Sequence, residues 1–286
     1  MALKELELEL KGLMQSLSNG ETAEVDPEVF EAAAEQLVTA FKKQLTQKRE
    51  KGFRVRMSNV GRPLCTLQME KSGAEREAFP YNHIMRMMIG DCVEVITRML
   101  LTIAKVDVTS DGDDVTMKVS KTTINGSSDI DIDGKVLDIK SSAPWAYKNK
   151  WSKGFDALLA EDDFGYVGQL FGYADAQKKP PGGWIVVDKS SGELMVVPVT
   201  ATVDQCKAIR ARRKHTVGSL ESDAPFQRNF EAEDEFFQRK ETGKKILCKS
   251  CSFCSFKKTC WPSAKYKPQA ESKAKFPPHK WYVDAD

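Results

Sequence analysis

The chain has 286 residues, of which 41% are hydrophobic and 29% charged, and its formal net charge is only +2. Its mean hydropathy is −0.43. No apolar run approaches the roughly 20 residues that span a bilayer, so the composition excludes a helical membrane protein and is typical of one large or two small globular domains. The N-terminal segment is too acidic for a signal peptide. We therefore expect a cytoplasmic protein, in the host cytoplasm if it is phage-encoded, with no membrane partner.

The N-terminal third is predicted to be helical. Leucines recur at helical spacing over residues 3–17, and Asp26-Pro27 is typical of an N-cap followed by a first-turn proline. We expect the second helix to bury Val29, Phe30, Ala33, Leu37 and Phe41. Residues 42–56 are basic, which indicates either a nucleic-acid contact or a solvated helix end.

A third helix is predicted over residues 85–103, followed by alternating strands and helices. Its buried side is expected to carry Met85, Met88, Ile89, Cys92, Ile96, Met99, Leu100 and Ile103. Strands are predicted at about 114–120, 127–132, 135–140, 184–188 and 194–199, with helices at about 164–177 and 202–214 and an irregular segment over 216–232. This order predicts an α/β protein with a mixed central sheet flanked by helices.

Two kinds of side chain suggest contact with nucleic acid. Basic groups gather in residues 42–56, in the helix at 202–214 and in the tail from Lys265 to Lys280, and such groups bind phosphate without reading sequence. Trp145, Tyr147 and Trp151 follow the strand at 135–140. They could stack on unpaired bases, and packing in a core or lid is the alternative.

Residues 129–140 are predicted to form a β-hairpin with acidic groups on one face. Asp133-Gly134 is a two-residue type I′ turn signal. A turn there places Asp129 opposite Asp138, at roughly 4.5–5.5 Å between Cβ atoms, and puts Asp138 and Lys140 on the same face. A divalent cation would offset the repulsion between the two carboxylates. The alternative is an ordinary solvated hairpin, with Asp131 and Asp133 simply exposed.

The cysteines suggest a metal site rather than disulfides. Seven is an odd number for a secreted disulfide framework, and four lie between Cys248 and Cys260. Cys248, Cys251, Cys254 and Cys260 could form a local tetrathiolate zinc site. Cys92 and Cys206 lie in predicted helices and are read as core cysteines.

Several motifs occur together in order. They are Gly90-Asp-Cys-Val-Glu94, Gly126-Ser-Ser-Asp129, Asp138-Ile139-Lys140, Gln169-x-x-x-Tyr173 and Cys251-x2-Cys254-x5-Cys260. The ordered set resembles the PD-(D/E)XK nucleases of the RecB type, especially the iron–sulfur branch that includes CRISPR-associated, helicase-linked and phage exonucleases. The resemblance covers roughly residues 60–262, whereas Asp-x-Lys alone is a very weak signal.

The resemblance implies a restriction-endonuclease-like αβββαβ core. It also implies three segments: an N-terminal helical region (1–58), a nuclease domain closed by an iron–sulfur cluster (59–262) and a basic tail (263–286). Cys65, Cys251, Cys254 and Cys260 would hold a [4Fe–4S] cluster in this reading. The extra Cys248 departs from the pattern and keeps zinc as the alternative.

The resemblance also implies roles at the hairpin. Glu94, Asp129, Asp138 and the carbonyl of Ile139 would hold Mg²⁺ or Mn²⁺, with Asp131 the main rival to Asp129. Lys140 would orient or activate the attacking water and offset charge on the phosphate. Gln169 and Tyr173 would position the water, the lysine or the DNA.

The expected function is a DNA exonuclease of recombination, repair, replication or DNA degradation. It would act on single-stranded or end-containing DNA. A structure-specific or restriction-type endonuclease on the same core, and a non-catalytic zinc-bearing nucleic-acid-binding protein, are the alternatives. A homo-oligomer and a helicase or recombination partner stay open.

Overall fold

The computed structural model describes residues 3–47, 52–112 and 114–283. The chain divides into two compact units. Unit 1 comprises residues 1–51, 55–61 and 80–218, and unit 2 comprises residues 52–54, 62–79 and 219–286. This division differs from the three predicted segments, because the N-terminal helices belong with the central sheet and the tail belongs with the cysteines. The basic stretch predicted at 42–56 includes residues 48–51, which lie outside the described part.

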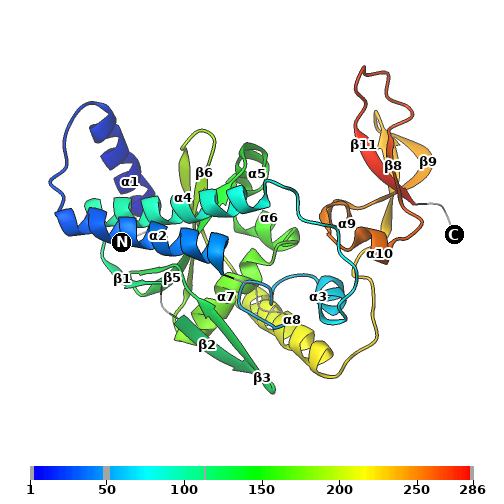
Figure 1. The fold of residues 1–286 in the computed structure, drawn as a ribbon, viewed down its shortest axis with the longest axis horizontal. Coiled ribbons are helices and arrows are strands. Elements are labelled where there is room, and N and C mark those ends of the chain that lie inside the picture. The colour runs from blue at the N-terminus through cyan, green and yellow to red at the C-terminus, as the bar shows by residue number, and fades with distance from the viewer. Residues whose placement is uncertain (1–2, 48–51, 113, 284–286) are drawn as a thin grey trace. The chain divides into compact units, whose positions relative to one another are not determined.

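Unit 1 holds most of the secondary structure (Figure 1). Its helices are α1 (Leu3–Ser18), α2 (Pro27–Thr46), α4 (His83–Ile103), α5 (Pro144–Asn149), η1 (Trp151–Lys153, a 3₁₀ turn), α6 (Phe155–Ala160), α7 (Tyr166–Gln177) and most of α8 (Val203–Glu221). Its strands are β1 (Val108–Asp111), β2 (Asp114–Val119), β3 (Thr122–Ser127), β4 (Ile130–Ile132), β5 (Lys135–Ser142), β6 (Pro181–Asp188) and β7 (Leu194–Pro198).

The central sheet has the strand order β1-β4-β5-β6-β7. β5 and β6 are parallel and the other neighbours are antiparallel, so the sheet is mixed, as predicted. The parallel pair requires a long crossover, which α5, η1, α6 and α7 provide. The strand predicted at 114–120 instead becomes β2 and pairs with β3 in a separate two-stranded sheet.

Alternate residues of β5 enter two different hydrophobic cores, which makes the sheet the middle layer of unit 1. Val136 packs with residues of the crossover helices, including the fully buried Phe171, and with Trp184 on β6. Leu137 and Ile139 pack on the opposite side with residues of α1 and α4, together with Ile130 and Ile132. These four apolar residues of the hairpin thus bury the face opposite to the one that carries the acidic groups.

Helix α4 exists as predicted, but the predicted buried side is only partly correct: five of its eight residues are half-buried and Leu100 packs against the core. Val95, Thr97 and Leu101 are buried, whereas Met85, Ile89 and Ile96 are exposed. Apolar residues occur around most of this helix, so their spacing does not specify which side meets the sheet.

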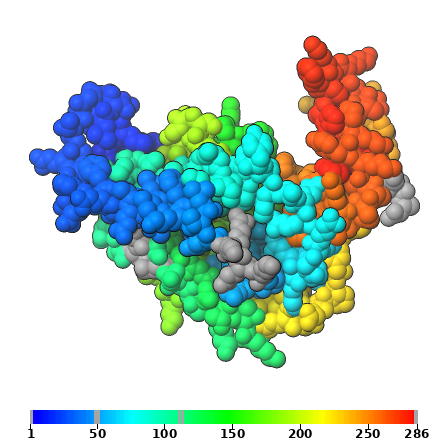
Figure 2. Space-filling model, viewed as in Figure 1, coloured from blue at the N-terminus to red at the C-terminus, as the bar shows by residue number. Residues whose placement is uncertain are grey.

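α4 also packs along α2, where Val29, Ala33, Leu37 and Phe41 are half-buried and Phe30 is exposed. In the view of Figure 2, α1 and α2 form part of the visible surface of unit 1.

Helix α2 begins as the sequence predicts. Asp26 is its N-cap and accepts a hydrogen bond from the backbone N–H of Glu28, and Pro27 occupies the first turn. Pro27 has no N–H to leave unsatisfied, and its fixed φ suits the start of a helix.

Unit 2 is smaller and contains strands that were not predicted. Its elements are α3 (Leu64–Lys71), β8 (Ala232–Phe237), β9 (Lys240–Leu247), α9 (Lys249–Phe253), α10 (Lys257–Cys260), β10 (Lys265–Pro268) and β11 (His279–Val283). The four strands form an antiparallel sheet in the order β10-β11-β9-β8. The tail over 263–286 therefore contributes two strands to a sheet. The irregular segment predicted from residue 216 begins later, after α8 ends at Glu221.

Glycines permit a close backbone approach between two parts of unit 1. A Cβ built on Gly168 would lie 2.4 Å from the Cα of Gly61, and one on Gly61 would lie 2.5 Å from the carbonyl oxygen of Gly165. These separations are far below van der Waals contact, so neither Gly61 nor Gly168 can carry a side chain without a backbone shift.

We predict that Gly168→Ala lowers the free energy of unfolding by about 1–3 kcal/mol, the usual cost of overpacking. Gly12→Ala is the matched control, because Gly12 lies in α1 with nothing near its missing Cβ. That change should raise stability by up to about 1 kcal/mol, the helix-propensity difference. Denaturant unfolding measures both, and a neutral Gly168→Ala would contradict the contact.

Candidate active site

The β4–β5 hairpin has the predicted register. Ile132 pairs with Lys135, and Asp131 pairs with Val136. Asp133 and Gly134 have φ values of 52° and 70°, as a type I′ turn requires. Continuing this register by one step brings Asp129 beside Asp138.

Asp129 is fixed to β5 by a backbone hydrogen bond. Its Oδ2 accepts the N–H of Ile139 at 2.7 Å. This contact holds the carboxylate of Asp129 beside the Asp138-Ile139-Lys140 segment, although Asp129 itself precedes β4. The hydrogen bond could not be predicted from residue spacing, because it depends on where the chain enters the strand.

Asp138 and Lys140 form an ion pair on one face of β5. The Lys140 Nζ lies 2.6 Å from Oδ2 of Asp138 and donates to Oδ1 at 2.8 Å. Asp138 is completely buried. Burial, together with the negative charge of Asp129, raises the pKa of the Asp138 carboxyl well above its usual range, against the opposing effect of Lys140. Burial alone would lower the pKa of Lys140, but Asp138 and Asp129 raise it above its ordinary value, so the ammonium stays charged.

Glu94 approaches the same group from α4. Burial and the nearby charge of Asp129 raise its pKa from 4.5 to about 7, while Arg98 and Lys140 act in the opposite direction. The Arg98 Nη2 lies 2.7 Å from Glu94 Oε1, one helical turn along α4. Arg98 was not predicted, although its i,i+4 spacing from Glu94 is a visible signal.

Gln169 and Tyr173 lie together on α7. The Gln169 Nε2 donates to the Tyr173 Oη at 3.0 Å. Burial raises the pKa of Tyr173 to about 12, opposed by the hydrogen bond from Gln169 and reinforced by the charges of Asp138 and Asp129. The phenol therefore lies close enough to Asp138 and Asp129 to be affected by their charges, and it stays protonated at neutral pH. A Cβ on Gly126 would lie 2.9 Å from Cε1 of Tyr173, so that glycine gives the tyrosine its space.

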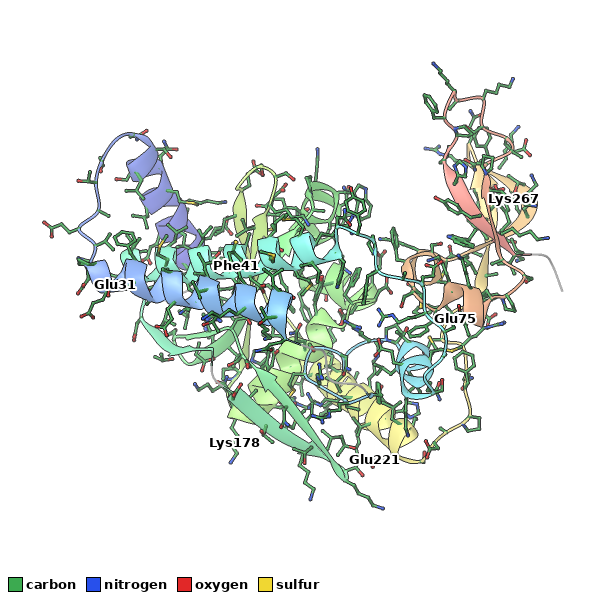
Figure 3. All side chains as sticks on the ribbon, viewed as in Figure 1. Glu31, Phe41, Glu75, Lys178, Glu221 and Lys267 are labelled. Atoms are coloured by element: carbon green, nitrogen blue, oxygen red, sulfur yellow. The ribbon has the colours of Figure 1, made fainter. Side chains whose placement is uncertain are left out.

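Asp131 has a different partner. It is fully buried, and its Oδ2 pairs with the Nζ of Lys179. Lys179 follows α7, whose C-cap Lys178 is labelled in Figure 3. This pair neutralises Asp131, which therefore differs from Asp129 in its surroundings even though the two share a face of the hairpin.

Two predicted base-stacking aromatics are core residues. Tyr147 and Trp151 are 8% and 3% exposed and pack in the core formed with the crossover helices, whereas Trp145 is 59% exposed. The core alternative is therefore correct for Tyr147 and Trp151. The sequence pattern could not separate them, because a short helix and a 3₁₀ turn orient these three residues differently.

The predicted basic surface of α8 is also partly a structural contact. Arg210 and Arg213 both bind the carboxylate of Asp175 on α7, and Arg213 is buried. The two guanidinium groups lower the pKa of Asp175 against the effect of burial. Arg213 is therefore not available to a phosphate backbone. In unit 2, Lys280 of the basic tail lies 3.4 Å from buried Glu235.

The cysteines of unit 2 form two neighbouring groups. The Cys65 thiol has its pKa raised by burial and by Cys254 and Cys260, and Cys254 has the same effect on Cys260. The Oγ1 of Thr66 lies 4.0 Å from Sγ of Cys254. Cys65 and the distal cysteines, far apart in sequence, therefore lie near one another.

Cys248 and Cys251 make up the second group. The Cys251 N–H donates to the Cys248 Sγ at 3.5 Å, and both residues are buried. Hydrogen bonding from Cys251 lowers the pKa of Cys248 to about 6, and Cys248 in turn raises that of Cys251. All seven cysteines are free, and Cys92 and Cys206 lie half-buried in unit 1 helices. Within the described ranges, no group of three or more His, Cys, Asp or Glu side chains has a geometry that could hold a metal ion.

Comparison with known proteins gives little further information. No family model matches the chain, and no curated protein matches it. One solved structure, described as the crystal structure of SSO0001, is 14% identical, with 79% of this chain and 94% of that chain covered and a TM-score of 0.42. Each described helix is too short or too polar to span a bilayer.

Glu94 generates a prediction about stability in the absence of divalent cations. Its folded-state pKa of about 7 exceeds the ordinary 4.5, so between these values the folded state keeps a proton that the unfolded state has lost. Stability should therefore fall as pH rises toward 7, and Glu94→Gln should remove this part of the decline. Denaturant unfolding in EDTA over this pH range measures the difference.

Glu31→Gln is the control, because Glu31 is an exposed glutamate on α2 (Figure 3). It should give the wild-type pH profile. Parallel profiles for the wild type and Glu94→Gln would show that Glu94 is not held in a desolvated, negatively charged site.

Proposed function

We propose that the chain is a metal-dependent DNA nuclease that hydrolyses phosphodiester bonds, acting as an exonuclease on single-stranded or end-containing DNA. The observation that carries the proposal is the gathering of Glu94, Asp129 and Asp138 around Lys140. These carboxylates come from α4, from the segment before β4 and from β5, and burial together with repulsion from Asp129 raises the pKa of Glu94 and of Asp138. Folding gains nothing from such repulsion, whereas a site for a cation and a phosphate requires it.

The donor set suits Mg²⁺ or Mn²⁺. The buried carboxylate of Asp138 is paired with the Lys140 ammonium at 2.6 Å but also faces the carboxylate of Asp129, so the group carries more negative charge than one lysine neutralises. Hard cations prefer carboxylate and carbonyl oxygens, so Glu94, Asp129, Asp138 and the Ile139 carbonyl would hold the ion. When bound, it would supply Lewis-acid polarisation of the scissile phosphate and acidify a bound water.

The protonation states assign roles to the neighbouring side chains. Because the pKa of Lys140 is raised, its ammonium can donate hydrogen bonds and offset negative charge, but it cannot accept a proton. We therefore give Lys140 the role of stabilising charge on the phosphate rather than that of a general base. Tyr173 remains a neutral phenol that can donate to the phosphate or to water, and Gln169 fixes its orientation through their hydrogen bond.

The proposal includes a restriction-endonuclease-like core and a thiolate centre in unit 2. The support for the core is the mixed sheet in which β5 carries the Asp-x-Lys pair and α7 the Gln-x-x-x-Tyr pair. The support for the centre is the proximity of Cys65 to Cys254 and Cys260, together with Cys251, whose carbonyl oxygen accepts the N–H of Cys254 at 3.1 Å. Thiolates are the ordinary ligands of a [4Fe–4S] cluster. A zinc site that uses Cys248 in place of Cys65 is the competing arrangement.

Cleavage should depend on the Asp138–Lys140 pair. With Mn²⁺, we expect the wild type to degrade end-labelled linear DNA and to spare circles, while Lys140→Ala and Asp138→Asn each lower the rate by at least about 100-fold, as loss of a charge-stabilising group does. Lys179→Ala is the matched control. It breaks the ion pair of Asp131, the other buried aspartate of the hairpin, and cleavage by the folded protein should persist.

Each other outcome has a definite meaning. Cutting of circles would replace the exonuclease by an endonuclease on the same core. Wild-type rates in Lys140→Ala would remove the proposed mechanism. Binding of DNA by a folded wild type that never cuts would indicate a non-catalytic binding protein.

The metal content of purified protein distinguishes the two thiolate centres. Anaerobically purified protein should be brown and contain about four iron atoms per chain, the content of one [4Fe–4S] cluster. Cys65→Ser should lose the iron, and Cys92→Ser, a change in α4 of unit 1, should retain it. A colourless protein with one tightly held zinc, unaffected by Cys65→Ser, would establish the alternative.

A further inference from the structure

Four aromatic rings form a row from the surface of unit 1 into its core. Phe164 stacks on Tyr166, with ring centroids 5.6 Å apart and an interplanar angle of 20°. Tyr166 stacks on Trp151 at 5.3 Å and 30°, and Trp151 lies 5.9 Å from Trp184. Trp184 is fully buried, whereas Phe164 is 57% exposed. The row therefore ends in an aromatic ring that solvent can reach.

Two lysines lie beside the outer rings of this row. The Lys140 Nζ is 5.6 Å from the centroid of Tyr166. The Lys150 Nζ is 5.6 Å from the centroid of Phe164 and 5.9 Å from that of Tyr166. Lys150 also donates to the carbonyl oxygen of Glu161 at 2.6 Å, which positions its ammonium beside the two rings, and its charge acts on the nearby buried carboxylate of Asp162. The exposed ring of Phe164 is thus bordered by the Lys150 ammonium, and the half-buried ring of Tyr166 behind it lies beside Lys140, the lysine of the proposed active site.

The turn that carries Phe164 is held rigidly. The buried carboxylate of Asp162 accepts the backbone N–H groups of Val167 and Gly168, which fixes the start of α7. Gly165 adopts φ 78°, and its carbonyl oxygen lies against Gly61. A single exposed apolar residue needs no explanation. Here, however, the exposed ring is pre-positioned, stacked and flanked by charge, and such rigidity lowers the entropy cost of binding a ligand.

We propose that the exposed ring of Phe164, supported from behind by Tyr166, forms a stacking platform that receives an unpaired nucleobase beside the active site, with Lys150 contacting the adjoining phosphate. An aromatic face with adjacent cations complements a base joined to a phosphate, and this is how single-strand binders hold their ligand. The interior base pairs of a duplex hide their faces in the stack. The platform therefore selects single-stranded DNA or a frayed end. The inference rests on the proposed function only in taking Lys140 as part of the active site.

The test measures binding in EDTA, so that it does not depend on cleavage. Fluorescence anisotropy with a labelled thymidine oligonucleotide should show about tenfold weaker binding for Phe164→Ala, within the range for loss of one base–aromatic stack. Phe164→Trp should restore affinity, because it keeps a large aromatic face. Phe30→Ala should bind like the wild type, since Phe30 is a comparably exposed phenylalanine on α2.

A second oligonucleotide separates stacking from charge. A strand of the same length without bases should bind the wild type and Phe164→Ala equally, and Lys150→Ala should weaken binding of both strands. Competition by closed circular duplex should be unchanged in Phe164→Ala. An unaltered affinity of folded Phe164→Ala for the normal strand, or an equal loss on the strand without bases, would overturn the platform.

The two proposals fail in different ways. A protein that never cuts DNA but loses single-strand affinity in Phe164→Ala would refute the nuclease and support the platform. A protein that cuts DNA and binds single strands normally in Phe164→Ala would support the nuclease and refute the platform.

Discussion

The burial of Asp138 beside a second carboxylate and one ammonium is the interaction on which the candidate site depends. A charged carboxylate without water is expensive, and a neighbouring negative charge adds to that cost. Lys140 offsets part of it, Asp129 is held by the Ile139 N–H, and Glu94 responds with a pKa of about 7. Each of these contacts helps to hold groups of like charge close together. The central sheet, α4 and α7 position the side chains that make them.

The hairpin offers a direct comparison between two buried aspartates. Asp131 pairs with Lys179, whose ammonium neutralises the charge of the buried carboxylate. Asp138 meets Lys140 but also faces Asp129, so its charge is only partly compensated. The same strand pair thus contains one buried aspartate that meets a lysine and another that meets a lysine and also faces a second carboxylate, about two residues apart in register. This contrast is a stronger indication of function than either residue alone.

Unit 2 shows how a loop-rich region can be organised around cysteines and a small sheet. Cys248 and Cys251 pack with Leu247 and Trp261 in a hydrophobic cluster. The buried Glu235 joins three strands and the segment after β10 through Tyr282, Thr242 and Gln269, which lower its pKa against burial. Basic composition made this region resemble a solvated tail, because short strands that pair with distant partners have no local pattern strong enough to reveal them.

The sequence by itself determined the elements whose signals are local. Asp26-Pro27 starts α2, and Asp133-Gly134 sets the turn of the β4–β5 hairpin. This turn also sets the register of the two strands. Because side chains alternate between the two faces, a shift of one residue would move every side chain to the opposite face. These features depend on backbone sterics within a few residues, so they can be predicted without knowing the rest of the fold.

Only the tertiary structure decided which side chains meet across the chain. The buried side of α4, the burial of Trp151, the pairing of Lys179 with Asp131 and the position of Tyr166 beside Lys140 all depend on how distant elements pack. A helix with apolar residues on most sides, or an aromatic in a short turn, has several equally favourable directions when considered alone. Close packing of the core selects one of them, because only one arrangement fills the space without voids or overlaps.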